Sequence, residues 1–506
     1  MSITSLLFVC FVLVAFVGYY LIPQKYQWIW LLIFSYIYYL STGFKTVIYL
    51  LSVTLSTYFC GRLIQKNNEG SKGKNQNRWI LIFALLFNFG ILAYLKYTNF
   101  VLFNIMRIFH TEIPLKELVL PLGISFYTFQ SMGYLLDVYW KKEKAETNPF
   151  RFALFVSFFP QILQGPISRF SDLGKQLFTP HKANTELFQR ALLFILFGLF
   201  KKLVLADTIA PFVDYIFSNY QELSGPYMIL GVLGYSAQLY GDFSGGMNVV
   251  EGVAMLFGIC LTPNFKQPFF ATSITDFWHR WHITLGTWMK DYVFYPVSLS
   301  KWMSKLSRFL KKHLGKKLGR SLPICIANLI VFFVVGIWHG AEWRYIIYGL
   351  YNGLIIGVSG LLADRYRKIK KQLSIKDSQR GWHLFQIFRT FLLVNISWFF
   401  DRAPSVSQAF SMIRKTVTEF TLLSPAHISQ TFSSISRVSM RCGIIGLSIL
   451  LIFMVSFLEE NGIKPFERFL KLPSYIKVFI YLSLLLLLPL LGQVPTVQGG
   501  FIYANF

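Results

Sequence analysis

The sequence has few charged residues, and acidic residues are scarcer than basic ones. Charged residues make up 14% of the 506 residues, while hydrophobic residues make up 54%. Soluble domains carry about 25% charged residues. This composition excludes an ordinary soluble protein and indicates a membrane protein whose chain crosses the bilayer many times.

The shortage of acid leaves a net charge of +26. Nucleic-acid binding is one interpretation of such a balance. Here the basic residues lie between apolar runs, so the positive-inside rule explains them better. We therefore expect anionic membrane lipids as partners and no nucleic acid. The first apolar run lacks a basic start and a small-residue cleavage site, so it is interpreted as a retained span. The first basic residues, Lys25 and Lys45, follow it, which favours an external N-terminus.

Cysteine is also scarce, and several motifs are missing. None of the five cysteines forms a CxxC pair, so neither a disulfide framework nor a zinc site is expected: Cys10, Cys60, Cys260, Cys325 and Cys442. The chain contains no HExxH, GxSxG or GxxxxGK[ST] motif. We expect no tightly bound metal or cofactor.

Long apolar runs are what the sequence does contain. They are continuous and rich in Leu and Phe, which favours helices over alternating strands. We predict an all-α protein with about eleven to thirteen transmembrane helices plus re-entrant and amphipathic helices, in one membrane-embedded domain over residues 1–506. The runs lie at 5–22, 28–42, 46–63, 79–97, 117–136, 150–167, 188–206, 226–241, 247–262, 324–341, 343–362, 384–400, 441–458 and 476–495.

Several segments between the runs have a distinct character. Residues 64–78 are predicted to form a polar cytoplasmic loop, and a short helix is expected near 407–419. Pro160, Gly165 and Pro166 break residues 158–170, whose backbone must then be buried in protein or line a wet cavity. Residues 301–320 carry many bases and no acid, which predicts a basic amphipathic helix on the cytoplasmic leaflet.

Residues 235–252 are too polar to face lipid. Gln238, Asp242, Ser244, Asn248 and Glu251 recur along this stretch, between two apolar segments. We interpret them as the inner wall of a cavity. A short external loop is the alternative.

Two histidines stand beside tryptophan in apolar surroundings. His339 follows Trp338 at the end of an apolar run, and the next run begins at Trp343. His282 follows Trp281 in a segment where Ser273 or Thr275 could cap a helix, with His279 and His282 on one face. An ionisable residue at membrane depth indicates a functional site. The alternative is a helix-end histidine bonded to carbonyl groups.

The chemistry that suits these histidines is acyl transfer. Zinc needs at least three protein ligands, and no third is evident. A neutral imidazole can act as a general base, and an apolar sheath protects an activated acyl group from hydrolysis. Burial favours that neutral form.

Five ordered blocks resemble the membrane-bound O-acyltransferase (MBOAT) family. They lie within residues 117–362 and read LPLGISFYTFQSMGYLLDVY, FFPQILQGPISRF, YGDFSGGMNVVEG, WHRWHITLGTWMKDYVFYPV and GIWHGAEWRYIIYGLYNG. They are most similar to the bacterial branch of alginate and peptidoglycan O-acetyltransferases and of teichoic acid D-alanylation. The final FIYANF also resembles that branch, whereas residues 1–100 and 365–495 match only in hydropathy.

The resemblance implies a site and a topology. The family's histidines fall on His339 and His282, in a ring of helices around a thin centre crossed by a tunnel. An acyl group, most simply acetyl, would pass from a cytoplasmic thioester such as acetyl-CoA or an acyl-carrier protein to an extracytoplasmic polymer. A partner of the SGNH-hydrolase type often completes the transfer, and the location implied is the bacterial cell membrane.

We assign roles on this basis as hypotheses. His339 is the general base, and His282 positions the acceptor or stabilises the oxyanion. Lys290 and Asp291 fix the amphipathic helix, and Asp291 is placed on the tunnel side. The tunnel and its acceptor side are assigned to Trp281, Trp288, Trp338, Gln238, Asp242, Ser244 and Asn248.

Some alternatives remain open at this level. His279 and the pair Ala504-Asn505 depart from the family pattern. D-alanyl transfer from a carrier protein is the main rival reaction, followed by lipid acylation. A glycan or lipid transporter would favour internal repeats, and none is found. A scaffold without chemistry is disfavoured by the paired His-Trp blocks.

Overall fold

The structure is a computed structural model that describes residues 1–70, 73–421, 431 and 438–492. Within these residues the fold is all-α, as predicted, and the only β-type pairing is an isolated bridge between Phe265 and Trp281. The longer helices are α1 (Leu6–Leu21), α2 (Gln27–Leu40), α3 (Phe44–Glu69), α4 (Lys74–Phe109), α5 (Ile124–Tyr139), α8 (Thr185–Leu199), α9 (Asp207–Ser218), α10 (Gly225–Leu256), α14 (Lys301–His339), α15 (Trp343–Gln372), α16 (Arg380–Arg402), α17 (Val406–Thr418), α19 (Val438–Glu460) and α21 (Ser474–Leu491).

Short helices connect these elements. They are α6 (Pro149–Ser157), α7 (Lys175–Phe178), α11 (Ile274–Arg280), α12 (Ile283–Met289), α13 (Tyr295–Ser298) and α20 (Pro465–Leu470). In the part of the chain that the structure describes, three π-helical segments interrupt the regular α geometry, at Phe170–Gly174, Phe200–Ala206 and Lys290–Phe294. Such π-segments occur frequently at functional sites.

Six of the described helices are long and apolar enough to cross a bilayer: α3, α4, α14, α15, α19 and α21. This is fewer than the eleven to thirteen predicted. Helices α1 and α2 have only 16 and 14 residues, and α5 has 16. The two runs 226–241 and 247–262 are one continuous helix, α10, of 32 residues. The external loop considered for residues 235–252 is therefore wrong.

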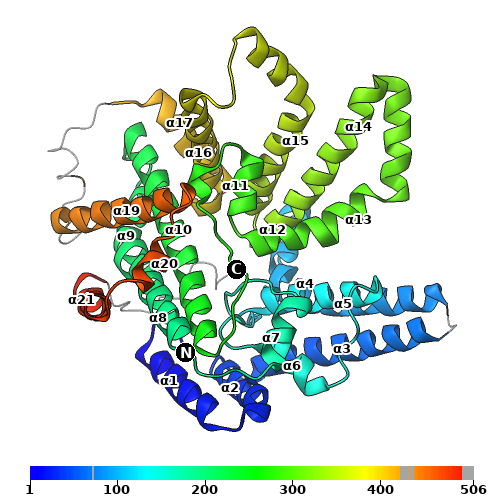
Figure 1. The fold of residues 1–506 in the computed structure, drawn as a ribbon. Coiled ribbons are helices and arrows are strands. Elements are labelled where there is room, and N and C mark those ends of the chain that lie inside the picture. The colour runs from blue at the N-terminus through cyan, green and yellow to red at the C-terminus, as the bar shows by residue number, and fades with distance from the viewer. Residues whose placement is uncertain (71–72, 422–430, 432–437, 493–506) are drawn as a thin grey trace.

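The long helices surround a central region that contains α11, α12 and non-helical chain (Figure 1). Residues 158–168 lie in this region, where they are non-helical and buried, as predicted. Gly123 allows the chain to approach them closely. It has φ of 76°, and a Cβ there would lie 2.1 Å from the carbonyl oxygen of Ile162. The irregular backbone is thus kept away from lipid by protein.

Helices α14 and α15 form a closely packed pair whose connecting corner follows His339. A Cβ at Gly349 of α15 would lie 2.2 Å from the Phe332 carbonyl oxygen of α14. A Cβ at Gly336 would lie 2.5 Å from the Tyr345 carbonyl oxygen. The two backbones can approach only because both positions lack a side chain. This contact fixes the end of α14.

The basic segment 301–320 differs from its prediction. It is not one surface helix, because Gly315 has non-helical backbone angles, with φ of 82° and ψ of 163°. The chain turns there, and Ser307 Oγ donates a hydrogen bond of 2.8 Å to the Gly319 carbonyl. The basic segment is therefore a helical hairpin whose second arm continues into the α14 span.

Of two further predicted segments, one has the wrong bounds and one is confirmed. The polar loop expected over 64–78 is too long, since α3 extends to Glu69 and α4 begins at Lys74. The helix expected near 407–419 is confirmed as α17. The similarity noted for the final FIYANF, with Ala504 and Asn505, lies outside the described residues.

Candidate active site

His339 is the last residue of α14 and is almost completely buried. It is 1% exposed, and the preceding Trp338 is 3% exposed. Gly340, Ala341 and Glu342 lead directly into α15. The Gly336–Gly349 contact brings the start of α15 against this end of α14, so the imidazole is held in the corner between two long helices.

His282 is positioned by a break between two short helices. Ser273 Oγ accepts a 3.0 Å hydrogen bond from the Asp276 amide, so Ser273 is the cap of α11, as predicted. The helix then ends at Arg280, and His282 has a φ of 49° in the left-handed region. The predicted common helical face for His279 and His282 is therefore wrong.

Asn264 supports this unusual backbone. Its Oδ1 accepts hydrogen bonds from the Thr284 amide at 2.9 Å and the Thr284 hydroxyl at 2.8 Å. The Ile283 amide donates to the Asn264 carbonyl at 3.0 Å. A left-handed conformation costs an L-residue about 1–2 kcal/mol, and such strain is concentrated at functional sites. The buried amide of Asn264 thus helps to hold His282 in place.

The two histidines flank the indole of Trp338. The ring centroids of His282 and Trp338 lie 5.6 Å apart, and those of Trp338 and His339 lie 5.2 Å apart. Phe126 meets Trp338 edge to face at 5.8 Å. Residues 57 positions apart in sequence (339 − 282) thus form one compact group.

Each histidine lines a different cavity. The His339 cavity has a volume of about 570 Å³ and is also lined by Lys96, Tyr235, Gln238 and Asp401. The His282 cavity has a volume of about 470 Å³ and is also lined by His279, Lys290 and residues of α14. Both imidazoles contact the indole of Trp338, so the histidine pair brings the linings of two cavities close together.

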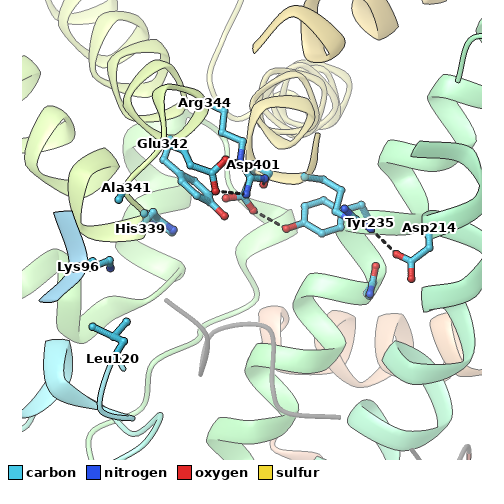
Figure 2. A pocket seen from close by; sticks show the side chains of 13 residues that line it. Lys96, Leu120, Asp214, Tyr235, His339, Ala341, Glu342, Arg344 and Asp401 are labelled. Carbon is cyan, nitrogen blue, oxygen red and sulfur yellow. Dashed lines mark hydrogen bonds and ion pairs between the residues drawn. The ribbon is translucent and has the colours of Figure 1, made fainter. Parts of the chain in front are cut away.

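Lys96 of α4 is a site residue that the sequence analysis missed. Its Nζ donates a hydrogen bond to the Trp338 carbonyl, and the neighbouring Tyr97 hydroxyl donates to the Ile337 carbonyl at 2.7 Å. Figure 2 shows Lys96 and His339 on one side of the cavity. A lysine inside the apolar run 79–97 was a usable signal, since charge at membrane depth indicates function.

The opposite side of the His339 cavity is a polar network. The Tyr235 hydroxyl donates to Asp401 Oδ2 at 2.6 Å (Figure 2). Arg344 donates to the Asp401 carbonyl at 2.9 Å and pairs with Glu342 at 2.8 Å. Basic and acidic side chains are equally numerous in this lining: Lys96, Arg344 and Arg402 against Asp214, Glu342 and Asp401. The cavity is therefore polar without a strong excess of either charge.

Most of the other predicted site residues do not line the His339 cavity. Of the four assigned to α10, only Gln238 lines the His339 cavity. Asp242 pairs with Lys202 at 2.6 Å, while Ser244 and Asn248 accept hydrogen bonds from Lys201 at 3.3 and 2.7 Å.

The tryptophans and Asp291 occupy supporting positions. Trp281 is completely buried among aromatic rings, and its ring centroid lies 5.4 Å from that of Trp398. Trp288 stacks on Phe129 at 4.3 Å and donates to its carbonyl at 2.9 Å.

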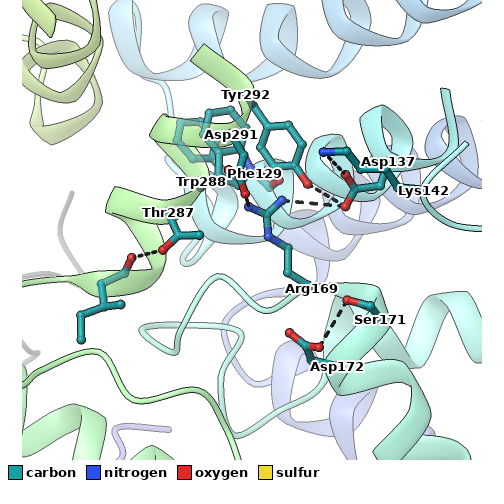
Figure 3. A network of polar contacts seen from close by, with 11 residues as sticks. Phe129, Asp137, Lys142, Arg169, Ser171, Asp172, Thr287, Trp288, Asp291 and Tyr292 are labelled. Atoms are coloured by element: carbon teal, nitrogen blue, oxygen red, sulfur yellow. Dashed lines mark hydrogen bonds and ion pairs between the residues drawn. The ribbon is translucent and has the colours of Figure 1, made fainter. Parts of the chain in front are cut away.

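Asp291 accepts a 2.8 Å hydrogen bond from Arg169 (Figure 3). Arg169 also lies 3.8 Å from Asp137, whose carboxylate accepts a hydrogen bond from Tyr292 at 2.8 Å. Burial raises the pKa of Asp137, against the opposing effect of Arg169 and Lys142. This network ties the segment after α12 to α5, and Asp291 lines neither histidine cavity.

Comparison with known proteins decides the family. The model of the membrane-bound O-acyltransferase family matches residues 144–310 and 301–400. The chain belongs to this family. A probable alginate O-acetylase of Pseudomonas aeruginosa is 32% identical over 418 residues, which cover 81% of this chain and 74% of that protein.

Two other relatives cover different shares of this acyltransferase. A peptidoglycan O-acetyltransferase of Helicobacter pylori is 31% identical over 447 residues, 82% of this chain and 79% of the relative. A teichoic acid D-alanyltransferase of Bacillus subtilis is 32% identical over 251 residues, 48% of this chain and 60% of the relative. The resemblance drawn from the five blocks is confirmed, and the protein is a membrane-bound acyltransferase with the MBOAT fold.

Proposed function

We propose that this enzyme moves an acetyl group from a cytoplasmic thioester across the membrane for the O-acetylation of an extracytoplasmic polysaccharide or cell-wall polymer. The observation that carries the proposal is the pair of buried histidines, each lining its own cavity, with ring centroids 5.6 and 5.2 Å from that of Trp338. A donor and an acceptor can therefore approach the histidine pair from different cavities.

The position of the basic segments indicates which side of the protein faces the cytoplasm. The hairpin at 301–320 begins α14, and the basic stretch 364–371 ends α15, so both lie at the ends remote from His339. The positive-inside rule puts those ends in the cytoplasm. The corner at Gly340 then faces outward, and the His339 cavity is the acceptor side. The His282 cavity, which borders the hairpin's helix, is the donor side.

The reaction balances with one proton moved through His339. The acceptor oxygen attacks the thioester carbonyl carbon while its proton passes to the imidazole. The carbon–sulfur bond then breaks, and the same proton passes to the leaving sulfur, which gives an ester and a free thiol. His282 was expected to position the acceptor or to stabilise the oxyanion; because it lines the other cavity, its proposed role becomes to hold the thioester on the donor side. The Lys96 ammonium, in the His339 cavity, would stabilise the negative charge that develops on the carbonyl oxygen.

The extent of similarity supports acetyl over D-alanyl transfer. The two relatives named for O-acetylation align with 81 and 82% of the chain, but the D-alanyltransferase aligns with only 48%. Acetyl-CoA is the simplest donor, with an acyl-carrier protein as the second candidate. A polymer acceptor is too large for the buried site. The family resemblance implies an extracytoplasmic partner of the SGNH-hydrolase type, which would receive the acetyl group first and pass it to the polymer.

Sealed vesicles that contain the purified protein in a known orientation test this proposal. Radiolabelled acetyl-CoA is supplied on the face of the basic hairpin, and a soluble hydroxyl acceptor is supplied on the opposite face. We expect acetyl ester on the acceptor side and free CoA on the donor side. If the protein transfers D-alanine from a D-alanyl carrier protein and no acetyl group from acetyl-CoA, the reaction is D-alanylation and not acetylation. Movement of intact acceptor without ester formation would reveal a transporter and contradict the proposal.

A further inference from the structure

A second concave region lies on the other side of α10 from the active site. One part, of about 610 Å³, is lined by charged residues of α8, α10 and α20. A neighbouring part, of about 410 Å³, is lined almost entirely by apolar residues of α10, α19 and the segment 267–270. Tyr240, Gln267, Ile452 and Ser456 line both parts. We call this continuous feature the α10–α19 groove, with a charged end and an apolar end.

The charged end is built from buried side chains. Lys201 is 6% exposed and Glu251 is 7% exposed, and both line the groove. An ammonium group has three N–H donors. Two of those on Lys201 are directed to Ser244 and Asn248, and the ammonium also lies 4.6 Å from the Phe197 ring centroid, a weaker contact that a phosphate oxygen could replace. Arg190 stands at the mouth of the same end.

Charges of both signs line this end. The basic residues are Arg190, Lys201, Lys266 and Lys464, and the acidic residues are Glu251, Glu459 and Glu467. Glu467 is already paired with Lys464 at 3.0 Å, and Glu459 accepts a hydrogen bond from Gln267 at 2.6 Å. Glu251 and Lys201 remain as a deeply placed pair of opposite charges. A ligand that carries both an anion and a cation would match them.

The charged end of the groove lies at the level of the lipid headgroups, and the apolar end lies at the level of the acyl chains. Glu459 and Glu460 end α19, where this spanning helix leaves the hydrocarbon layer. The charged end lies at that level. The apolar end lies further along the span, where Ile449 and Phe453 are 41% and 51% exposed. It therefore opens toward the bilayer interior.

We propose that the groove binds one membrane phospholipid whose headgroup carries a phosphate and a primary ammonium, as in phosphatidylethanolamine. The phosphate contacts Lys201 and Arg190, and the ammonium contacts Glu251. One acyl chain lies between Phe269 and Phe453. The lipid fills the space between α19 and α10 and so attaches the C-terminal helices to the rest of the protein. This inference does not depend on the acyl-transfer proposal.

Native mass spectrometry of the full-length protein tests the site. The protein is reconstituted in bilayers of equal phosphatidylethanolamine and phosphatidylglycerol with different chain masses, then released in mild detergent. We expect one phosphatidylethanolamine to be retained per protein. Arg190→Gln should lower that occupancy about tenfold, the effect of losing one hydrogen bond to a charged group.

Adjacent positions on α19 supply a matched pair of variants. Ile449 lines the groove, whereas Leu450, 56% exposed, does not. Ile449→Trp should remove the bound lipid, and Leu450→Trp should leave it in place. The proposal is overturned if no lipid is retained, if the two lipids are retained equally, or if the two tryptophan variants behave alike. Retention of phosphatidylglycerol in preference would overturn the assignment of the headgroup.

Discussion

The buried ion pair between α10 and the preceding π-segment gives a prediction whose size follows from the structure. Lys202 Nζ lies 2.6 Å from Asp242 and 2.9 Å from Asp207, and the side chains of Lys202 and Asp242 are 4% and 1% exposed. Removing one member of a buried pair costs about 3–5 kcal/mol because the other charge stays desolvated. Asp207 remains in contact in Asp242→Leu, so we expect the lower limit, about 3 kcal/mol, or about a hundredfold more unfolded protein.

The double variant Lys202→Met/Asp242→Leu provides the decisive comparison. Replacing both buried charges by apolar groups of similar size is often neutral, but the change also removes the Lys202 partner of Asp207, whose side chain is 20% exposed. The stability of the double variant should therefore lie between those of wild type and Asp242→Leu. Unfolding in mixed micelles of mild detergent and dodecyl sulfate, followed by tryptophan fluorescence, measures both changes. Lys317→Ala removes an exposed pair with Asp364 and should leave the stability close to that of wild type.

Activity of the same double variant separates a structural role from a catalytic one. Asp242 was predicted to line the acceptor cavity, but in the structure its carboxylate forms an ion pair with Lys202. The double variant should therefore retain acyl transfer. A stable double variant that no longer transfers the acyl group would refute the structural role and restore Asp242 to the site.

Three other predictions concern the residues that place the histidines. Gly349→Ala should push α15 away from α14, because its Cβ would lie 2.2 Å from the Phe332 carbonyl oxygen. Overpacking of this kind costs about 1–3 kcal/mol of stability, so both the melting temperature and the transfer rate should fall. The control is Gly360→Ala on the same helix, whose Cβ would meet no atom within 4 Å and which should leave both unchanged. Lys96→Met should lower kcat about 10²-fold with little change in donor KM, as expected when charge stabilisation is lost in the transition state. Lys96→Arg should recover part of the lost kcat. A fall in kcat/KM that comes only from a higher KM would exclude this role of Lys96. Asn264→Ala should release the Thr284 contacts and lower kcat while the protein still elutes as a single species, whereas an unchanged rate would show that His282 is held without this amide.

Periodicity and composition predict much of this fold. Continuous apolar runs predict α3, α4, α14, α15, α19 and α21, because a spanning helix must be long and apolar on all sides. Composition alone does not distinguish a span from a helix buried inside the protein. Helix α5 is apolar and short, and it is buried on nearly every face. The polar middle of α10 suggested a loop or a cavity wall. It is helical, its polar side chains bond buried lysines of the adjacent π-segment, and Ser244, Asn248 and Glu251 line the α10–α19 groove.

The site was predictable in its histidines and less so in its surroundings. His339 and His282 stand in blocks that resemble the family, and the structure brings their rings to the same indole. The helix break at His282 could not be read from spacing, since it depends on Asn264 and on a bridge to Phe265. Lys96 is far away in sequence and approaches Trp338 only through packing of α4 on α14. Long-range contacts of this kind leave no periodic signal.

The central claim is that His339 takes the proton from the acceptor hydroxyl. The most direct measurement compares acyl-transfer rates of purified wild-type protein and His339→Ala in the same bilayer, with saturating thioester donor and acceptor. Loss of a general base should lower the rate about 10²–10⁴-fold while donor KM and the elution profile stay unchanged. A His339→Ala protein that transfers the acyl group at the wild-type rate would contradict the account.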